Sequence, residues 1–497
     1  MERAQEQAQK GNSRLALWAV VLALGAGLLL VSQTVAGYRD EGLHLLAAQF
    51  IGIGRRPYLD FFFQHTPLYA YLNAVCLAVF GPGWRAPHVL SALLTGAAIL
   101  LVADFVYARL RTPAWRLPGA ITAALLMGLN TLVIRFGTIS QPYAPCLFFG
   151  AAAFRLTVKA AEASTGLLPL WAGVGAGAAA ASSLLAAPIA PILLVWLIWN
   201  TTRGNRLKRC SQFLAGCAVP FLPLLWLAAH GPQQVLFNLI EFHLFYRASV
   251  FLPSVGLLQW DLGVLTGLLH STQGLVLVGL GVLCIADVGK WQAALRAELY
   301  LCFWLTAFLG LYAAITRPTF EQYFVLTAPF LSILAAFGLC SLGSWLWPAR
   351  RAAWVVLGIT GLYCLQMHQL RWLFYPCWRQ IEAVAQAMNQ VVPQNEYFYS
   401  AYESVYFDAR RLPPPGMENN FAPVLRLPEA LAKSLHVVPQ QQIEDWLAGG
   451  MFAAVLIRAE NPRVESLGLR RVYRKQREMT CYNSRHYLFY DRASTSR

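Results

Sequence analysis

Long apolar stretches divide the chain into two parts. Between Leu15 and Phe374, apolar runs of about 20 residues recur, and each is long enough to cross a bilayer as a helix. The pattern predicts a polytopic α-helical membrane domain over residues 1–374. We expect about eleven transmembrane helices, over residues 15–36, 86–109, 117–134, 142–160, 167–183, 185–200, 210–229, 272–288, 297–316, 321–346 and 352–374.

The remaining segment, residues 375–497, mixes polar and apolar positions and predicts a small soluble α/β domain. Helices are expected over residues 375–390, 427–434 and 441–448, and strands over residues 396–400, 453–458 and 487–490. Cys377 and Cys481 both lie in this domain. Whether they form a disulfide stays open, because a sequence does not give the distance between two Cβ atoms.

Composition and charge narrow the class of protein. Hydrophobic residues make up 57% of the chain and charged residues 13%, which excludes an ordinary soluble protein. The net charge of +15 would suit binding to nucleic acid, but most Lys and Arg residues lie in short loops expected on one side of the membrane. Such an excess is typical of cytoplasmic loops. We therefore expect a multi-pass inner (plasma) membrane protein with a cytoplasmic N-terminus, an extracytoplasmic C-terminal domain and no nucleic-acid partner. Residues 66–80 are expected as an amphipathic or re-entrant helix in the outer interface.

The first loop expected outside, residues 37–85, is too long for a simple connection. The acidic pair Asp40–Glu41 follows the first span where lipid gives way to water, and charge there is costly unless it serves a function. Asp60 and His65 come next, with arginines before and after them. This mixture suits the transfer of a sugar from a lipid phosphate. A carboxylate accepts the proton of the attacking hydroxyl, and arginines stabilise the departing phosphate.

Four short motifs in these regions carry a family resemblance. They are the pair Asp40–Glu41 after the first helix, the PYLD segment Pro57–Asp60, the HTPLYAY segment His65–Tyr71, and the RPTFEQY segment Arg317–Tyr323. In them the chain resembles the GT-C superfamily, in particular the family 39-like branch. That branch includes protein O-mannosyltransferases and the aminoarabinose transferases that act on lipid A. Thr66 stands where the family has the first proline of its third motif.

The resemblance implies a GT-C fold, a sugar donor carried on polyprenyl phosphate, and an extracytoplasmic lipid, glycan or protein acceptor. It also implies that no cofactor and no metal ion take part. Asp40 would be the catalytic base, and Glu41 would support the acceptor or the loop. Substrate-binding residues are expected at Asp60, His65, Arg85, Arg317 and Tyr323.

Five of these residues have a structural alternative. Asp40 can cap an interfacial helix, and Asp60 can pair with a neighbouring arginine. His65 can be a hydrogen-bonded structural histidine, and Arg85 and Arg317 can anchor helices to lipid headgroups. Two other functions also stay open: a transporter or lipid flippase, and a non-catalytic subunit that binds envelope lipid or glycan.

Overall fold

The computed structural model describes residues 2–34, 39–163, 166–251, 256–346, 352–374 and 377–492. Contacts group the chain into two compact units. The first, which we call the membrane unit, comprises Met1–Gln33, His88–Pro223 and Ser254–Arg371. The second, which we call the loop unit, comprises Thr34–Pro87, Leu224–Pro253 and Trp372–Arg497. The described part of the loop expected outside, residues 39–85, therefore packs in one unit with the C-terminal segment, and we call it the first outer loop after that expectation. A domain boundary at residue 374 stays a prediction.

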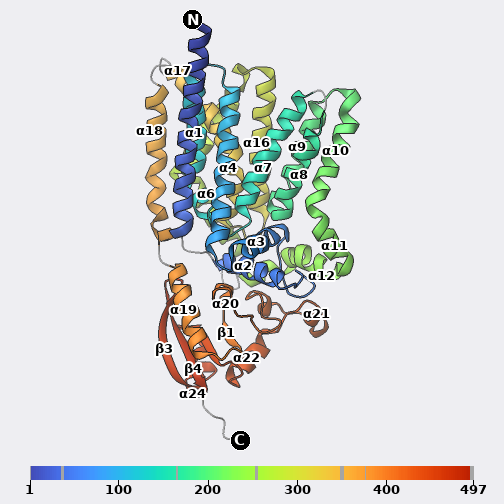
Figure 1. Cartoon of the computed structure of the whole chain (residues 1–497), viewed down its shortest axis with the longest axis vertical. Helices are drawn as coiled ribbons and strands as arrows, with labels where there is room; N and C mark the ends of the chain where they lie inside the picture. The colour runs from blue at the N-terminus through green and yellow to red at the C-terminus, as the bar shows by residue number, and fades with distance from the viewer. Residues whose placement is uncertain are drawn as a thin grey trace. The chain divides into compact units, whose positions relative to one another are not determined.

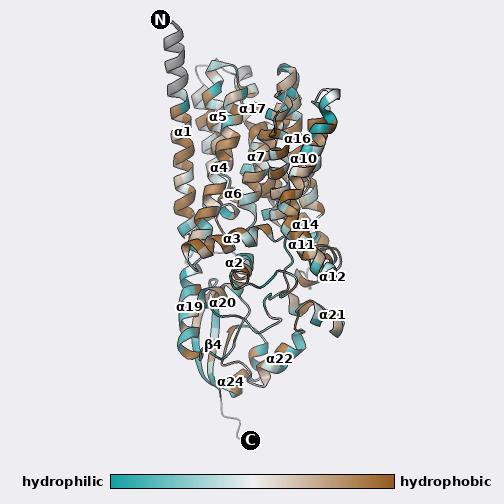
Figure 2. Ribbon diagram, turned by 45° about the vertical axis from the view of Figure 1, so that its right-hand side comes forward, coloured by the Kyte–Doolittle hydropathy of each residue, from teal (hydrophilic) through white to brown (hydrophobic). Residues whose placement is uncertain are grey.

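The membrane unit is a bundle of helices (Figure 1). Its main helices are α1 (Glu2–Thr34), α4 (Arg85–Arg109), α5 (Pro113–Gly128), α6 (Thr131–Phe136), α7 (Tyr143–Glu162), α8 (Leu168–Ser182), α9 (Ile189–Trp199), α10 (Arg206–Ala218), α14 (Leu257–Leu269), α15 (Thr272–Ala286), α16 (Ala293–Ile315), α17 (Ala328–Leu346) and α18 (Ala352–Cys364). Figure 2 shows that hydrophobic residues predominate along most of them.

Over the described ranges, six helices are long and apolar enough to cross a membrane, or seven if the bent pair α14 and α15 forms one span. Shorter apolar helices include Leu168–Ser182 and Leu184–Trp199. The chain is thus a multi-pass α-helical membrane protein, as predicted. The number of about eleven spans stays a prediction.

One predicted span, residues 117–134, is wrong because two helices replace it. The side chain of Asn130 accepts hydrogen bonds from the backbone nitrogens of Leu132 (2.9 Å) and Val133 (3.3 Å), and so caps α6. The amide of Asn130 also donates to the hydroxyl of Tyr363 at 2.9 Å. Capping and this buried hydrogen bond stabilise a break that the apolar run alone does not reveal.

The predicted span 210–229 falls within Arg203–His230, which is long and apolar enough to cross a membrane, and one helix beyond the predicted set meets α15 at a bend. The predicted span 210–229 runs through α10, a 3₁₀ turn at Val219–Phe221 that contains Pro220, and α11 (Leu222–His230). Helix α14 was not predicted. It meets α15 at an angle of 71°, where Ser271 caps α15 by accepting from the nitrogen of Gly274 at 2.9 Å.

The loop unit combines helices with a four-stranded sheet. Its helices are α2 (Arg39–Gly52), α3 (Leu68–Phe80), α12 (Pro232–Leu236), the π-helix η4 (Phe237–Tyr246), α13 (Arg247–Phe251), α19 (Cys377–Val391), α20 (Glu403–Ala409), α21 (Glu429–Ser434), α22 (Gln440–Ala448), α23 (Arg463–Ser466) and α24 (Leu469–Val472). Its strands are β1 (Phe398–Ser400), β2 (Ala454–Arg458), β3 (Tyr473–Cys481) and β4 (Ser484–Arg492).

The sheet has the order β1-β2-β4-β3, with β1 and β2 parallel and the other pairs antiparallel. The predicted α/β class of the C-terminal segment is confirmed, as is the helix expected over residues 66–80. Strand β3 and helix α20 were missed. Strand β3 is largely exposed, so it lacks the alternating apolar pattern that identifies a strand. The side chain of Cys377 lies outside the described residues, and with it the question of a disulfide to Cys481.

Residues from all three segments of the loop unit build one hydrophobic core. Its buried members are Phe62, Phe237, Phe242, Ala422, Leu425, Ala432, Leu435 and Val437. Polar contacts also join these segments. The nitrogen of Phe63 donates to Asn238 at 3.0 Å, and Arg55 pairs with Glu418 at 3.4 Å. The first outer loop therefore folds as part of a larger body.

Candidate functional site

The acidic pair Asp40–Glu41 lies in the first turn of helix α2. Carboxylates are stabilised there because the N-terminus of a helix carries partial positive charge. Asp40 keeps part of its surface exposed, whereas Glu41 is fully buried. The position fits a helix-stabilising role and leaves Asp40 partly exposed, so its role as catalytic base stays a prediction.

One turn further along α2, His44 lies against His65 of the HTPLYAY segment. Their ring centroids are 4.7 Å apart, and Tyr69 lies 5.7 Å from His44. Burial lowers the pKa of His44 to about 3. Burial also lowers the pKa of His65 well below its ordinary value, helped by the nearby His44, His243 and Arg247. Both imidazoles are therefore neutral near pH 7 and can each donate or accept a hydrogen bond.

Tyr58 fixes the segment that carries His65. It adopts a positive φ of 67°, which a residue with a large side chain rarely does. Its nitrogen donates to the carbonyl of Phe61 at 3.0 Å, and its hydroxyl donates to the carbonyl of His65 at 2.6 Å. The PYLD motif thus forms a strained turn that holds His65, a use that sequence reasoning did not foresee.

Two residues that sequence reasoning missed belong to the same cluster. His243 comes from the π-helix η4, and its ring bonds the carbonyl of Gln64 at 2.8 Å. Arg247 is the first residue after η4, and it is 5% exposed. π-helices occur often at functional sites. The sequence gave one indication of Arg247. It lies in a loop expected outside, whereas arginines are usually enriched in cytoplasmic loops.

Asp60 is engaged by Arg56. It accepts hydrogen bonds from the backbone nitrogen of Arg56 at 2.7 Å and from Nε and Nη2 of its guanidinium, both at 2.9 Å. These bonds hold the pKa of Asp60 below its usual value. Asp60 therefore forms the ion pair with a neighbouring arginine that the sequence allowed as an alternative. A role of Asp60 in substrate binding stays a prediction.

Arg85 also has partners within the loop unit. Its guanidinium lies 4.5 Å from the ring of Trp84 and donates to Glu382 of α19 at 3.3 Å. Trp84 donates to the same carboxylate at 3.1 Å and stacks on Trp378 with a centroid distance of 5.0 Å. Arg85 is an exposed side chain at a junction between α19 and the first outer loop. Its binding of phosphate stays a prediction.

Arg317 and Tyr323 belong to the membrane unit. The Nε of Arg317 lies 3.8 Å from the carboxylate of Asp261, which also accepts from the nitrogen of Thr319 at 2.8 Å. Tyr323 packs against Phe320 with a centroid distance of 5.7 Å. Asp261 thus anchors the RPTFEQY segment to α14, and the exposed guanidinium of Arg317 remains accessible to a ligand.

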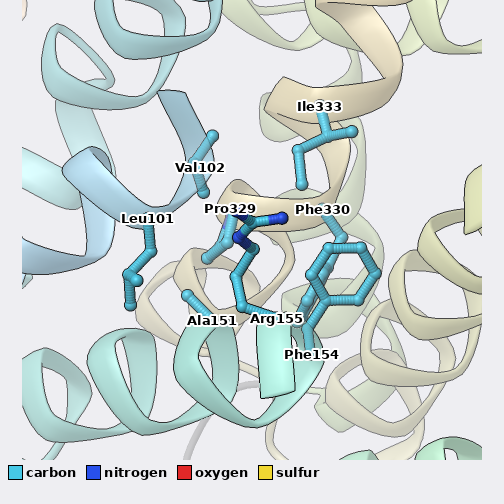
Figure 3. Close-up of a pocket in the computed structure, with 8 residues that line it drawn as sticks. All are labelled: Leu101, Val102, Ala151, Phe154, Arg155, Pro329, Phe330 and Ile333. Carbon is cyan, nitrogen blue, oxygen red and sulfur yellow. The ribbon is translucent and has the colours of Figure 1, made fainter. Parts of the chain in front are cut away.

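The membrane unit also holds a small pocket around Arg155 (Figure 3). It is lined otherwise by apolar side chains, namely Leu101, Val102, Ala151, Phe154, Pro329, Phe330 and Ile333. Arg155 pairs with Asp104 and lies 5.3 Å from the ring of Phe105. A sugar needs several polar groups for its hydroxyls, and this lining offers one that is already paired.

Among the residues that the structure describes, no three His, Cys, Asp or Glu side chains are grouped as metal ligands would be. The expectation that neither metal nor cofactor takes part stays a prediction.

No protein-family model matches the chain, and no curated protein matches it in sequence. Solved structures do match. ArnT from Cupriavidus metallidurans bound to undecaprenyl phosphate gives a TM-score of 0.63 at 14% identity, over 95% of this chain and 97% of that one. Its apo form gives the same score and identity over 96% and 98%.

This chain has the GT-C fold. The archaeal oligosaccharyltransferase AglB from Archaeoglobus fulgidus, solved with an inhibitory peptide and a dolichol-phosphate, also shares it. That match has a TM-score of 0.52 and 14% identity, over 88% of this chain and 69% of that one. The predicted fold class is confirmed, and the likeness covers both the membrane helices and the C-terminal sheet.

Proposed function

We propose that the protein is an integral membrane glycosyltransferase. It moves a sugar from a polyprenyl-phosphate carrier to a hydroxyl of an extracytoplasmic lipid, glycan or protein acceptor. Two proteins with the same fold support this proposal, since one was solved with undecaprenyl phosphate and the other with a dolichol-phosphate. The observation that carries it is local. The partly exposed residue Asp40 lies in the first turn of the helix that holds His44 against His65, in one unit with the buried cation Arg247.

In the proposed reaction, the acceptor oxygen attacks the anomeric carbon of the sugar. A new carbon–oxygen bond forms while the bond from that carbon to the phosphate oxygen breaks, and the electron pair leaves with polyprenyl phosphate. Asp40 takes the proton of the acceptor hydroxyl. General-base catalysis of this kind accelerates a reaction by about 10²–10⁴-fold.

The leaving phosphate gains negative charge and needs cations and hydrogen-bond donors. Arg247 offers a buried guanidinium whose N–H groups can donate to phosphate oxygens. His44 and His65 offer neutral imidazole donors, because burial lowers the pKa of each. The phosphate contacts that the family resemblance implies for Arg317 and Tyr323, both in the membrane unit, stay a separate prediction. Arg85 would have to leave Glu382 to bind phosphate.

This chemistry suits a donor presented outside the cytoplasm. The distribution of Lys and Arg supports a cytoplasmic N-terminus and extracytoplasmic loops that include residues 37–85. We accordingly propose an inner-membrane location with the C-terminal domain outside. Labelling of single cysteines by a membrane-impermeant thiol reagent in intact cells would test this orientation.

The proposed activity is tested with purified protein in lipid nanodiscs. A panel of polyprenyl-phosphate-linked radiolabelled sugars is offered together with envelope extract as acceptor, and labelled products are separated from donor. Transfer from at least one donor supports the proposal. Binding of the carrier without transfer would indicate the non-catalytic subunit instead, and movement of the carrier across a bilayer without transfer would indicate the flippase.

A further inference from the structure

Helix α20 of the C-terminal segment touches the start of α2 without any side chain between them. A Cβ atom added at Gly42, next to the acidic pair, would lie 2.5 Å from the backbone nitrogen of Ser404 and 3.1 Å from its Cα. Real Cβ atoms do not approach backbone that closely, so only glycine permits this contact. Both helices belong to the loop unit (Figure 1). The contact sets the position of the first turn of α2.

Ser404 is held in turn by the tip of the β3–β4 hairpin. The hydroxyl groups of Ser404 and Tyr482 share a hydrogen bond of 2.9 Å, and both side chains are at least partly buried. Tyr482 also packs on Tyr402 with a centroid distance of 5.0 Å. The negative charge of Glu41 acts on the Tyr482 phenol, whose pKa is raised mainly by burial and further by that charge. The phenol therefore lies within electrostatic reach of Glu41, and through Ser404 it reaches the backbone contact with Gly42.

The hairpin tip is strained in a way that keeps Tyr482 there. Tyr482 and Asn483 have positive φ angles of 48° and 55°, as a two-residue turn of this kind requires. Asn suits that conformation, whereas Tyr rarely adopts it. Asn483 and Gln380 exchange two hydrogen bonds of 2.9 and 2.7 Å, which fix the turn from the other side. Strain of this sort persists where surrounding contacts impose it, often at functional sites.

We propose that Ser404 and Tyr482 are positioning residues for the Asp40–Glu41 pair, an inference that rests on the proposed function. They touch neither donor nor acceptor. They act through Gly42, by fixing where the first turn of α2 places its carboxylates. The C-terminal segment thereby takes part in setting the catalytic geometry, in addition to any contact it makes with acceptor.

The test uses the full chain and compares Tyr482→Phe with Tyr473→Phe. Tyr473 lies on the same hairpin and donates one buried hydrogen bond, to the carbonyl of Phe452 at 2.8 Å. Each variant loses one hydroxyl, so similar falls in melting temperature are expected. Only Tyr482→Phe should lower kcat, by about 10- to 100-fold, since a small misplacement of a catalytic group has an effect of that order. KM for the donor should stay within about twofold, because the residue makes no ground-state contact.

A second comparison tests the close contact itself. Gly42→Ala places a methyl group against Ser404, whereas Gly52→Ala adds one at the other end of the same helix, where no atom lies within 4 Å. Gly42→Ala should reproduce the loss of kcat, and Gly52→Ala should not. Ser404→Ala combined with Tyr482→Phe should cost no more than either alone, because both remove the same hydrogen bond.

Unchanged kcat in both Tyr482→Phe and Gly42→Ala would overturn the positioning role while leaving the glycosyltransferase proposal intact. Equal kcat losses in the Tyr482 and Tyr473 variants would also overturn it, since the effect would then be one of general stability. Absence of transfer by the wild-type protein with every donor would instead refute the proposed function.

Discussion

In the membrane unit, charges within the helices stand as opposite pairs, such as Arg155 with Asp104 and Arg109 with Glu298 at 2.7 Å. In the loop unit, the candidate site collects groups of several kinds. Neutral histidines lie beside a buried arginine, and an acidic pair occupies a helix terminus. Opposite pairs satisfy one another and leave little for a ligand. The loop unit has opposite pairs as well, Arg56 with Asp60 and Arg85 with Glu382, but its mixed cluster adds neutral imidazoles that can donate to a phosphate.

The comparison therefore separates structural charge from functional charge. Substitutions in the membrane unit should act on stability with little effect on turnover by the folded protein. Substitutions in the loop-unit cluster should act on binding or turnover with less effect on stability.

The largest expected effect on stability is in the membrane unit. Asp104→Leu leaves the guanidinium of Arg155 without its carboxylate in a largely apolar pocket. Removing one partner of a buried pair costs about 3–5 kcal/mol, and the lower end applies because Asp104 itself is half exposed. Chemical denaturation in detergent micelles would measure the loss. The double variant Asp104→Leu/Arg155→Met should recover most of it, and failure to recover would contradict the pairing account.

Arg247→Met should weaken binding of the carrier phosphate by about 10- to 100-fold, since a charged hydrogen bond is lost from a buried site. The methionine keeps much of the apolar stem, and the melting temperature, measured in parallel, separates a loss of binding from a loss of stability. Binding of polyprenyl phosphate, followed by isothermal titration, gives the comparison with Arg477→Met, an exposed arginine of β3. Equal binding by both variants would remove Arg247 from the site.

His44→Leu should change how stability depends on pH. The pKa of His44 is about 3 in the folded protein and near 6.5 when unfolded, so below pH 6.5 only the unfolded chain gains this proton. Stability from His44 is therefore present above pH 6.5 and falls by up to about 1.4 kcal/mol per pH unit below it. His243, with a pKa lowered to about 4, acts in the same direction. Glu418, with a pKa raised to about 7, opposes it.

The free energy of unfolding of His44→Leu should accordingly gain on wild type by about 2 kcal/mol between pH 7 and pH 5. Denaturation of both proteins at the two pH values measures this gain directly. A constant difference between variant and wild type would mean that His44 is not buried as a neutral group.

The smallest effect is expected at Asp60. Because its carboxylate is occupied by a partly exposed Arg56, Asp60→Asn should change KM and kcat by less than about twofold. Steady-state kinetics with the best donor would measure it. A loss of more than about tenfold in kcat/KM would instead support the substrate-binding role implied by the family resemblance.

The sequence predicted the elements whose periodicity is local. The helix over residues 66–80 and the strands β1 and β2 follow from apolar pattern alone. It did not predict the break at Asn130 or the π-helix that carries His243. The first depends on a cap and the second on packing against Phe62. Propensity is a weak guide where tertiary contacts decide.

The candidate site shows the same division. Motifs identified Asp40, Glu41 and His65, because each lies in a short segment with a recognisable pattern. The partner of Arg85 is Glu382, nearly 300 residues later, and Gly42 meets Ser404 at a similar separation. Contacts of that kind come from topology, which hydrophobic pattern does not specify. Arg247 could be noticed in the sequence as an arginine in a loop expected outside, but the sequence did not show which residues lie next to it.

The account depends on one claim, that the Asp40 carboxylate takes the proton of the acceptor's hydroxyl group. Its most direct test is single-turnover transfer by Asp40→Asn in nanodiscs, with Asp491→Asn as the matched control. Asp491 is an exposed residue of β4 with a positive φ that asparagine accepts readily. The account predicts that Asp40→Asn transfers sugar about 10²–10⁴-fold more slowly and still binds polyprenyl phosphate like wild type. Transfer by Asp40→Asn at the wild-type rate would contradict it.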